Sequence, residues 1–236
     1  MMLADMHTHI LPEMDDGSAS VEESLEMLRC QWEQGVRHVA ATPHFYARYD
    51  SPAHFLDRRS RAEEKLRAAM DGCDKLPRLT VGAEVYYYRG LSEWSDLSQF
   101  TIGGGDCVLI EMPQWPWPEA AFQELEEIWV KRGLLPVIAH VERYLVPFHT
   151  RRLMERLGDL PVLVQTNAAF FLEPSTARLA LRLLRQERIH LLGSDCHNLT
   201  DRKPNLSSAV ERITQKLGSD ALDRIADCQN RVLQNT

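Results

Sequence analysis

The feature that most constrains the fold of this chain is an alternation of short apolar runs with longer amphipathic stretches, maintained from end to end. Short runs rich in apolar and β-branched residues predict strands, and apolar residues spaced three to four apart predict helices. Chains that alternate the two build βα units around a parallel sheet. The predicted strands cover residues 3–7, 36–42, 79–84, 107–111, 135–140, 162–167 and 189–195. This number of strands in one chain indicates an α/β barrel.

The helical stretches carry clear start and stop signals. Ser20 followed by Glu23 forms a capping box, and Gly35 ends the helix that this box begins. A second helix is predicted over 119–131, with Gly133 beyond its end. Further helices are predicted over 53–70, 150–156, 175–186, 205–217 and 220–233. Because no repeat, low-complexity tract or linker interrupts the pattern, residues 1–236 are expected to form a single domain.

The charge and the cysteine content limit the function and the compartment. A formal net charge of -7 argues against a protein that grips nucleic acid, because such proteins carry a basic surplus. The five cysteines are odd in number and include no C-x-x-C pair, which fits free thiols in a reducing compartment. The N-terminus shows neither a signal peptide nor a long apolar run. We therefore expect a cytoplasmic protein that does not insert into a membrane.

Histidines and carboxylates recur at the C-terminal ends of the predicted strands. In parallel barrels these ends form the active-site face, so side chains placed there converge on one cup. A single strand-end His or Glu is more often a cap or a surface group than a ligand, but the repeated placement favours a shared site. The residues so placed are His7, His44, Glu84, Glu111, His140 and Asp195.

Three further residues complete a candidate metal site. His7 and His9 stand two positions apart on an extended backbone, so that both imidazoles can reach one cation, and Asp195 and His197 repeat that spacing. Asp16 adds a carboxylate from the loop after the first strand. A mixture of imidazoles and carboxylates without thiolates suits Mn, Fe or Zn better than Ca or a structural zinc site.

These residues resemble the polymerase and histidinol phosphatase (PHP) superfamily, and within it the bacterial manganese-dependent tyrosine phosphatases that accompany capsule and exopolysaccharide kinases. The segments that carry the resemblance follow the family's order along nearly the whole chain. They are residues 5–12 (DMHTHILP), 15–17 (DDG), 41–44 (ATPH), 82–87 (GAEVYY), 110–112 (IEM), 136–144 (PVIAHVERY) and 194–198 (SDCHN). The resemblance implies a distorted (β/α)7 barrel, the TIM-like PHP fold, with three divalent metal ions, manganese first and iron or zinc as alternatives.

The resemblance also implies roles for individual residues. A first metal would be held by His7, His9, Glu84 and Asp195, a second by Glu84, Glu111 and His140, and a third by Asp16, His44 and His197. Glu84 would therefore bridge the first and the second metal. Arg143 and Arg202 are the implied phosphate ligands, for which surface ion pairs are the alternative. Asp195 or a metal-bound water is a candidate proton donor.

The function that follows is hydrolysis of a phosphate monoester, with phosphotyrosine as the first choice, by a metal-activated hydroxide without a phosphoenzyme. The expected substrate is a phosphotyrosine protein, and a bacterial tyrosine kinase of polysaccharide export is the first candidate. The alternatives are a small-molecule phosphatase such as a histidinol-phosphate phosphatase, a barrel deoxyribonuclease, and a metal-binding module without catalytic activity. Asp16 and His197 weaken the nuclease alternative because they supply a third metal site.

Aromatic residues beside the predicted site leave the details of substrate contact open. Phe45 and Tyr46 follow His44, where relatives often carry more polar or basic residues. Trp115 and Trp117 lie in a predicted loop on the active-site side. They either wall in an aromatic leaving group or, in the interpretation that we favour, pack against the neighbouring helix.

One cysteine invites a different mechanism. Cys196 and Arg202 have the C-x5-R spacing of thiol-based tyrosine phosphatases. That loop depends on glycines whose backbone N–H groups surround the phosphate, and this stretch has none. Cys196 is therefore interpreted as a spacer that faces away from the metals.

Overall fold

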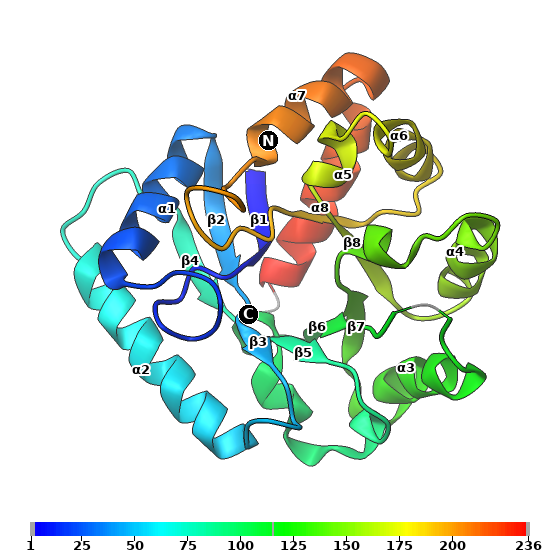
Figure 1. Cartoon of the computed structure of the whole chain (residues 1–236), viewed down its shortest axis with the longest axis horizontal. Helices are drawn as coiled ribbons and strands as arrows, with labels where there is room; N and C mark the ends of the chain where they lie inside the picture. Colours follow the sequence, from blue (N-terminus) through cyan, green and yellow to red (C-terminus); the bar gives the residue numbers. More distant parts are fainter. Residues whose placement is uncertain (1–2, 115, 235–236) are drawn as a thin grey trace.

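The computed structural model describes residues 3–114 and 116–234. Over these ranges the strands form two parallel sheets with the helices arranged around them (Figure 1). The first sheet has the order β1-β2-β4 and consists of β1 (Leu3–Thr8), β2 (Val36–Ala41) and β4 (Arg78–Val81). The second has the order β3-β5-β6-β7-β8-β9 and consists of β3 (His44–Phe45), β5 (Glu84–Tyr86), β6 (Cys107–Glu111), β7 (Leu135–Ile138), β8 (Leu163–Asn167) and β9 (Leu191–Gly193). Neighbouring strands pair in parallel throughout.

Two short breaks connect the sheets and correct a sequence-based expectation. The predicted strand 79–84 is wrong as a single strand, because it is divided between β4 and β5, which lie in different sheets. A two-residue connection likewise separates β2 from β3, a strand that the sequence did not predict. The backbone still pairs at the break, since the Gly82 N–H donates to the Ala41 carbonyl at 2.8 Å and the Glu84 N–H to the Pro43 carbonyl at 3.0 Å. Pro43 has no N–H, so an ordinary ladder cannot continue through it.

The outer strands β1 and β9 approach each other at their C-terminal ends. The Asp195 N–H donates to the His7 carbonyl at 2.8 Å, and the His9 N–H donates to the Cys196 carbonyl at 2.9 Å. Gly193 permits this approach, because a Cβ atom at that position would lie 2.6 Å from the His7 Cβ. The two sheets thus curl into one parallel wall, and the C-terminal ends of its strands face the same side.

The predicted helices are all present, with ends within two residues of those expected. The Ser20 hydroxyl accepts a hydrogen bond from the Glu23 N–H at 3.2 Å, which confirms the cap, and Gly133 follows its helix in the left-handed conformation at φ 66°. The α-helices are α1 (Val21–Glu33), α2 (Pro52–Met70), α3 (Glu119–Arg132), α4 (Thr150–Gly158), α5 (Ala169–Leu172), α6 (Ala177–Arg185), α7 (Leu206–Leu217) and α8 (Asp220–Gln234). The short α5 was not predicted. No helix within the described ranges is both long enough and apolar enough to span a bilayer.

The connection from β5 to β6 and the segment after β7 contain short 3-10 turns. They are η1 (Leu91–Glu93), η2 (Ser95–Phe100), η3 (Ile102–Gly104) and η4 (Val141–Tyr144). Of these, η4 directly follows the predicted ligand His140 and carries Arg143. These turns were not predicted, because single turns of this kind have no repeating apolar pattern to identify them.

Hydrophobic side chains lie on both faces of the strands, and this leaves only one end of the wall for a site. In β6, Val108 and Ile110 join the outer layer that the helices cover, whereas Leu109 faces the interior of the curled wall. Side chains of α8 complete that interior, and the Gln229 side chain donates to the Ala4 carbonyl at 2.8 Å, near the start of β1. Because α8 packs against the beginning of the strands, their C-terminal ends remain available for polar side chains.

Candidate metal centre

The C-terminal ends of the strands bring together the histidines and carboxylates that the sequence singled out. They form overlapping groups whose ligand atoms lie within 4.8 Å of one another. The groups are His7, His9 and Asp195; His9, Asp16, His44 and His197; and His44, Glu84 and Glu111. His140 joins the cluster because its Nε2 lies 2.7 Å from the Glu84 Oε1. The implied grouping therefore differs, since His9 joins Asp16, His44 and His197, and since His44 as well as His140 faces the pair Glu84 and Glu111.

Glu84 occupies the centre of this cluster. Its Oε2 lies 2.9 Å from the His44 Nδ1, 3.2 Å from the His7 Nε2 and 3.3 Å from the His9 Nε2. The same oxygen is buried and makes no hydrogen bond. Leaving a buried carboxylate oxygen without a partner is unfavourable, and a cation between it and the imidazoles would remove that penalty. The donor set thus fits a divalent metal.

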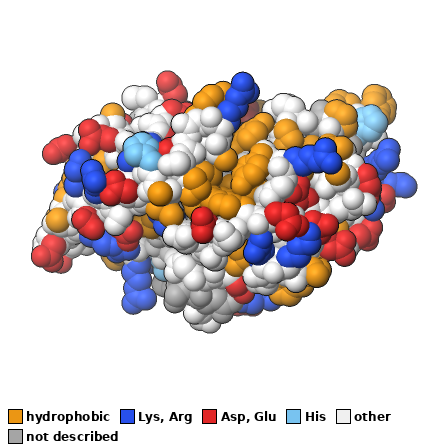
Figure 2. Space-filling view, turned by 90° about the horizontal axis from the view of Figure 1, so that it is seen from below, with side chains coloured by type: hydrophobic (Ala, Val, Ile, Leu, Met, Phe, Trp, Pro, Cys, Tyr) orange, Lys and Arg blue, Asp and Glu red, His pale blue; other side chains and the backbone are white. Residues whose placement is uncertain are grey.

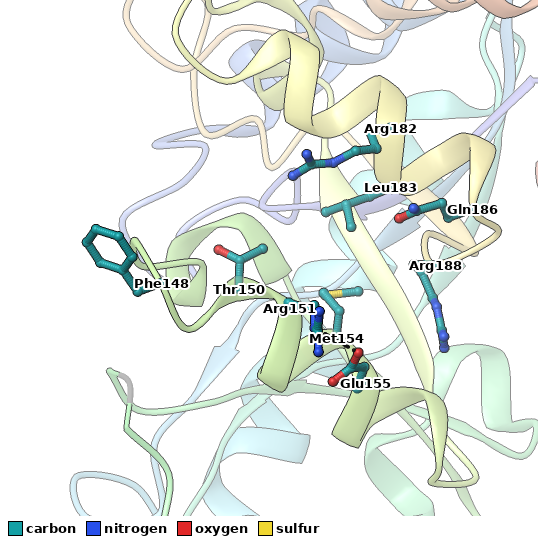
Figure 3. A pocket seen from close by; sticks show the side chains of 9 residues that line it. All are labelled: Phe148, Thr150, Arg151, Met154, Glu155, Arg182, Leu183, Gln186 and Arg188. Carbon is teal, nitrogen blue, oxygen red and sulfur yellow. Dashed lines mark ion pairs between the residues drawn. The ribbon is translucent and has the colours of Figure 1, made fainter.

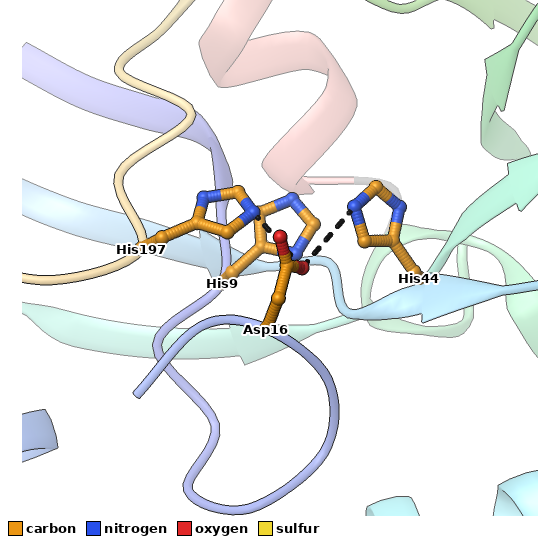
Figure 4. A group of neighbouring side chains, drawn as sticks. All are labelled: His9, Asp16, His44 and His197. Atoms are coloured by element: carbon orange, nitrogen blue, oxygen red, sulfur yellow. Dashed lines mark ion pairs between the residues drawn. The ribbon is translucent and has the colours of Figure 1, made fainter. Parts of the chain in front are cut away.

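A second part of the cluster is open to solvent on one side (Figure 4). His9, His44 and His197 surround Asp16, whose Oδ1 lies 3.6 Å from the His44 Nε2 and 3.3 Å from the His197 Nε2. Asp16 is 65% exposed, whereas the His197 Nε2 is buried and without a hydrogen bond. A second buried ligand atom without a partner, facing a carboxylate, supports cation binding here as well.

Asp15 is a functional candidate that the sequence did not separate from its neighbour Asp16. The His9 Nδ1 hydrogen-bonds to the Asp15 Oδ2 at 2.7 Å, and the His44 N–H donates to the same oxygen at 2.8 Å. A carboxylate on the far nitrogen of a ligating imidazole fixes the ring and its tautomer. Gly17 is required beside it, because a Cβ atom at that position would lie 2.2 Å from the His9 carbonyl oxygen. Asp15 therefore orients two candidate ligands, and its backbone loop presents Asp16.

Two candidate ligands have backbone conformations that residues other than glycine rarely adopt. His140 has a φ of 31° and Asp195 a φ of 54°, both in the left-handed region. Such conformations typically cost about 1–3 kcal/mol and persist where surrounding contacts enforce them. For Asp195 the contact is its hydrogen bond to the His7 carbonyl, and for His140 it is the 2.6 Å hydrogen bond from its N–H to the Gln165 Oε1. Strain of this kind is characteristic of functional sites.

Arg143 and Arg202 lie on either side of Asp195. The Arg143 Nη2 donates to the Asp195 Oδ2 at 2.5 Å, and the Arg202 Nη2 donates to the Oδ1 at 2.9 Å. The other terminal nitrogens face further site carboxylates, Arg143 at 3.7 Å from Glu111 and Arg202 at 3.6 Å from Asp16. Both side chains remain more than a third exposed. These arginines therefore form the rim of the cluster rather than isolated surface ion pairs.

Opposite charges within the cluster outweigh the effect of burial on protonation. Burial alone would lower the pKa of His7, but the carboxylates of Glu84 and Asp195 raise it above its usual value. Burial alone would raise the pKa of Glu84, but the imidazoles of His7, His140 and His44 hold it well below its usual range. In the absence of metal, protons on imidazoles therefore balance the charge of the buried carboxylates.

His9 and His197 respond to the cluster in opposite ways. Burial opposes the charged form of both, but Asp15 and the other carboxylates raise the pKa of His9 well above its usual value. Burial and the neighbouring His9 instead lower the pKa of His197 to about 4. The His197 imidazole is therefore neutral near pH 7 and has a lone pair available for a cation.

Comparisons with known proteins agree with this geometry. A family profile described as capsular polysaccharide synthesis, CpsB/CapC, matches residues 3–233. The chain belongs to the CpsB/CapC family. The tyrosine-protein phosphatase CpsB of Streptococcus pneumoniae is 28% identical over 230 residues, which cover 92% of this chain and 92% of that protein. The tyrosine-protein phosphatase YwqE of Bacillus subtilis is 28% identical over an alignment of 247 residues, which covers 99% of this chain and 92% of that protein.

Solved structures of this family have the same fold. A crystal structure described as YwqE from Bacillus subtilis and CpsB from Streptococcus pneumoniae, unique metal-dependent tyrosine phosphatases, matches with a TM-score of 0.85 at 27% identity. The match covers 99% of this chain and 95% of that chain. An amidohydrolase from Bifidobacterium longum subsp. infantis matches with a TM-score of 0.55 at 11% identity, which shows a similar fold alone. The family resemblance drawn from the sequence is thus confirmed.

In this CpsB/CapC family member, β8 supplies no predicted ligand but links several of them. The Gln165 Oε1 accepts from the His140 N–H at 2.6 Å and lies 3.3 Å from the His7 Nδ1. The Gln165 Nε2 donates to the Asn167 Oδ1 at 3.0 Å, and the Asn167 Nδ2 donates to the Asp195 Oδ2 at 2.9 Å. Sequence reasoning missed both residues, because neutral amides inside a strand carry no spacing signal.

Replacing Gln165 with leucine is expected to weaken metal binding by about 10- to 100-fold, as is typical when partners of ligands are lost. The reason is that the acceptor shared by His140 and His7 disappears. Metal affinity, measured by competition with a fluorescent chelator, checks the result. Gln229→Leu is the matched control, because it removes a buried glutamine whose hydrogen bond to Ala4 lies at the other end of β1. Equal metal affinities of the two variants would contradict a positioning role for Gln165.

The remaining sequence-based interpretations concern Trp117, Trp115 and Cys196. Trp117 is buried, donates to the Pro113 carbonyl at 2.7 Å and packs against Phe122 of α3, with ring centroids 5.6 Å apart. It therefore packs against the neighbouring helix, as favoured, while Trp115 lies outside the described residues. Cys196 is fully buried in the outer hydrophobic layer, and burial raises the pKa of its thiol, which does not suit a nucleophile.

Proposed function

We propose that this protein is a metal-dependent protein-tyrosine phosphatase that hydrolyses phosphotyrosine. The observation that carries the proposal is the cluster of imidazoles and carboxylates centred on Glu84, whose buried Oε2 has no hydrogen bond. Family membership supports the choice of substrate, because CpsB of Streptococcus pneumoniae and YwqE of Bacillus subtilis are both named tyrosine-protein phosphatases. The phosphate would bind at the exposed side of the cluster, between Arg143 and Arg202.

The proposed cofactors are three divalent ions, with manganese first and iron or zinc as alternatives. They would be held by His7, His9, Asp16, His44, Glu84, Glu111, His140, Asp195 and His197, of which Glu84 would bridge. Such ions supply an activated water near neutral pH and neutralise phosphate charge. The mixed nitrogen and oxygen donors suit these metals, and the cluster contains no thiolate among the described residues.

The side chains at the rim have separate proposed roles. Arg143 and Arg202 present guanidinium groups that would exchange part of their pairing with Asp195 for the phosphate oxygens. Asp195 itself acts as an anionic ligand, because His7 and His9 hold its pKa far below the usual range in spite of burial. That low pKa argues against Asp195 as the proton donor. The phenolate leaving group has a pKa of about 10, so it departs without a strong acid.

The finer features of the fold and setting are also proposals. Reading β2 with β3 and β4 with β5 as interrupted single strands gives a seven-strand distorted barrel, formed by one domain over residues 1–236. The expected substrate is a phosphotyrosine protein, for which a bacterial tyrosine kinase of polysaccharide export is the first candidate. The described cysteines are free, which supports a reducing, cytoplasmic environment.

A substrate panel tests the function. The manganese-loaded protein is offered a phosphotyrosine peptide, histidinol phosphate and single-stranded DNA, and release of phosphate or nucleotides is measured. We expect turnover of the phosphotyrosine peptide at a kcat/KM at least about tenfold above that of histidinol phosphate, with no DNA cleavage. Faster turnover of histidinol phosphate would establish a small-molecule phosphatase instead. No turnover of any compound by the metal-loaded protein would favour a non-catalytic module.

A further inference from the structure

An aromatic groove opens directly beside the metal centre. It has a volume of about 780 Å³, and its walls include Tyr46, Tyr49, Pro52, Tyr86, Tyr88 and Trp94. The groove lies where the segment between β3 and α2 meets the segment that follows β5. In the view from below, Figure 2 shows hydrophobic side chains gathered at the middle of the face where these segments lie in Figure 1. A concave surface of this size is typical of ligand pockets.

The groove is continuous with the metal centre through Tyr46. The Tyr46 hydroxyl donates to the Glu111 Oε2 at 3.2 Å, and its ring centroid lies 5.2 Å from that of His44. Tyr46 also lines the adjacent cavity that contains Asp16 and His44. A phosphate at the cluster therefore places the atoms attached to it at the mouth of the aromatic groove.

The rings that line the groove contact one another and form one aromatic wall. The Tyr46 centroid lies 5.3 Å from that of Tyr86 and 6.4 Å from that of Tyr49, with tilts of 40° and 64°. Aromatic pairs prefer such tilted arrangements at 4.5–7 Å. Tyr49 touches Tyr46 and lies beneath the Arg48 guanidinium, but it is 79% exposed at the rim, so most of its ring stays available to a ligand. Large exposed apolar side chains beside a site are typical of binding surfaces.

We propose that this aromatic groove binds an aromatic side chain of the substrate protein that lies within three residues of the phosphotyrosine. The inference rests on the proposed phosphatase function. Two ring-to-ring steps of 5.2 and 5.3 Å lead from His44 through Tyr46 to Tyr86. An extended chain advances about 3.3 Å per residue, so the two steps together span at most about three residues of peptide. The groove would therefore select among phosphotyrosine sequences rather than take part in the chemistry.

A second large cavity is not lined by candidate metal ligands. It lies between α4 and α6, has a volume of about 790 Å³ and is lined by Arg151, Arg182 and Arg188 among others (Figure 3). No candidate metal ligand lines it, and Phe148 at its margin points outward and is fully exposed. Arg151 is paired with Glu155 at 3.1 Å. Since no candidate ligand is among the described residues that line this cavity, the aromatic groove is the surface that substrate flanks would meet.

The test compares two phosphotyrosine peptides on the manganese-loaded enzyme. The first pair differs only at a position two residues from the phosphotyrosine, where one peptide carries phenylalanine and the other alanine. The same comparison is then made at each other position within three residues on either side. In at least one pair, the kcat/KM of the phenylalanine peptide is expected to exceed that of the alanine peptide by about 3- to 10-fold, mainly through KM. Tyr49→Ala is expected to reduce this ratio below about 2, and Tyr88→Ala provides a second variant.

Trp129→Ala is the matched control, because it removes an exposed aromatic side chain of α3 that lies outside the groove. Its ratio is expected to equal that of the unaltered enzyme. Ratios near 1 for the unaltered enzyme in every pair, with both peptides turned over, would overturn the groove and leave the phosphatase function standing. A ratio that persists in both Tyr49→Ala and Tyr88→Ala would also overturn it. If neither peptide is turned over, the phosphatase function itself fails, and this inference falls with it.

Discussion

Replacing Glu84 with glutamine is expected to lower kcat/KM for a phosphotyrosine substrate by at least about 10²-fold and to reduce the bound metal per chain. Glutamine keeps the size and shape of the side chain but removes its charge. The Oε2 of Glu84 faces three imidazole nitrogens within 3.3 Å, and its Oε1 hydrogen-bonds to His140. No other carboxylate among the described residues touches so many of the candidate ligands, so its loss affects every part of the cluster.

The measurement pairs metal analysis of the purified variant with steady-state kinetics at fixed manganese. Glu124→Gln serves as the control, because Glu124 is also a buried carboxylate but bonds to Tyr87 and the Gly90 N–H, away from the cluster. This control is expected to retain metal and turnover. If Glu84→Gln retains both bound metal and turnover, the carboxylate is not a bridging ligand, and the proposed mechanism is wrong.

The convergence of the candidate ligands was predictable because of a general property of parallel sheets. His7, Glu111 and Asp195 lie far apart in the chain, but each follows or ends an apolar run. The carboxyl ends of parallel strands meet on one side, so their polar residues must converge there. Neither the interior side chains nor the helices needed to be placed for this argument. The strongest part of the sequence-based prediction therefore rests on topology rather than on detailed packing.

The residues that the sequence did not identify act through tertiary contacts, which produce no periodic pattern in the sequence. Asp15 and Asp16 are adjacent in one loop, and only the fold shows that Asp15 turns toward His9 while Asp16 faces His44 and His197. Gln165 is a neutral residue within a strand, and its importance lies in the His140 backbone that it holds. Such supporting residues depend on tertiary distances.

The division of strand 79–84 was missed for a related reason. Residues 79–83 read as one apolar run that ends at Glu84, yet a Cβ atom at Gly82 would lie 3.1 Å from the Ile102 Cα. The chain therefore changes direction where η3 packs against it, and β5 begins at Glu84 in the second sheet. The close approach that favours glycine at this point comes from a segment twenty residues later, which local sequence patterns do not reveal. The shift nevertheless matters for function, because it delivers Glu84 to the centre of the cluster.

Removing the metal is expected to lower the melting temperature by roughly 8–16 °C, and the loss should be larger at pH 8 than at pH 6. A ligand at 1,000 times its Kd stabilises by about 4.1 kcal/mol, and about 2–4 °C accompany each kcal/mol in a chain of this size. The pH dependence follows from the metal-free cluster. The raised pKa of His7 gives stability that is present below its ordinary value of 6.5 and is lost as the pH rises through the raised pKa.

The carboxylates act at the other end of the pH range. The lowered pKa of Glu84 gives stability that is present above its ordinary value of 4.5 and is lost only as the pH falls through the lowered pKa. The contributions of His7 and Glu84 are therefore both present between about pH 4.5 and 6.5, and that of His7 is lost above this range, where cations compete best because protons no longer occupy its imidazole. Thermal unfolding with manganese or with EDTA, at pH 6 and pH 8, measures the difference. Glu84→Gln should show little response to manganese at either pH, and an equal response of the unaltered protein at both would contradict proton competition at His7.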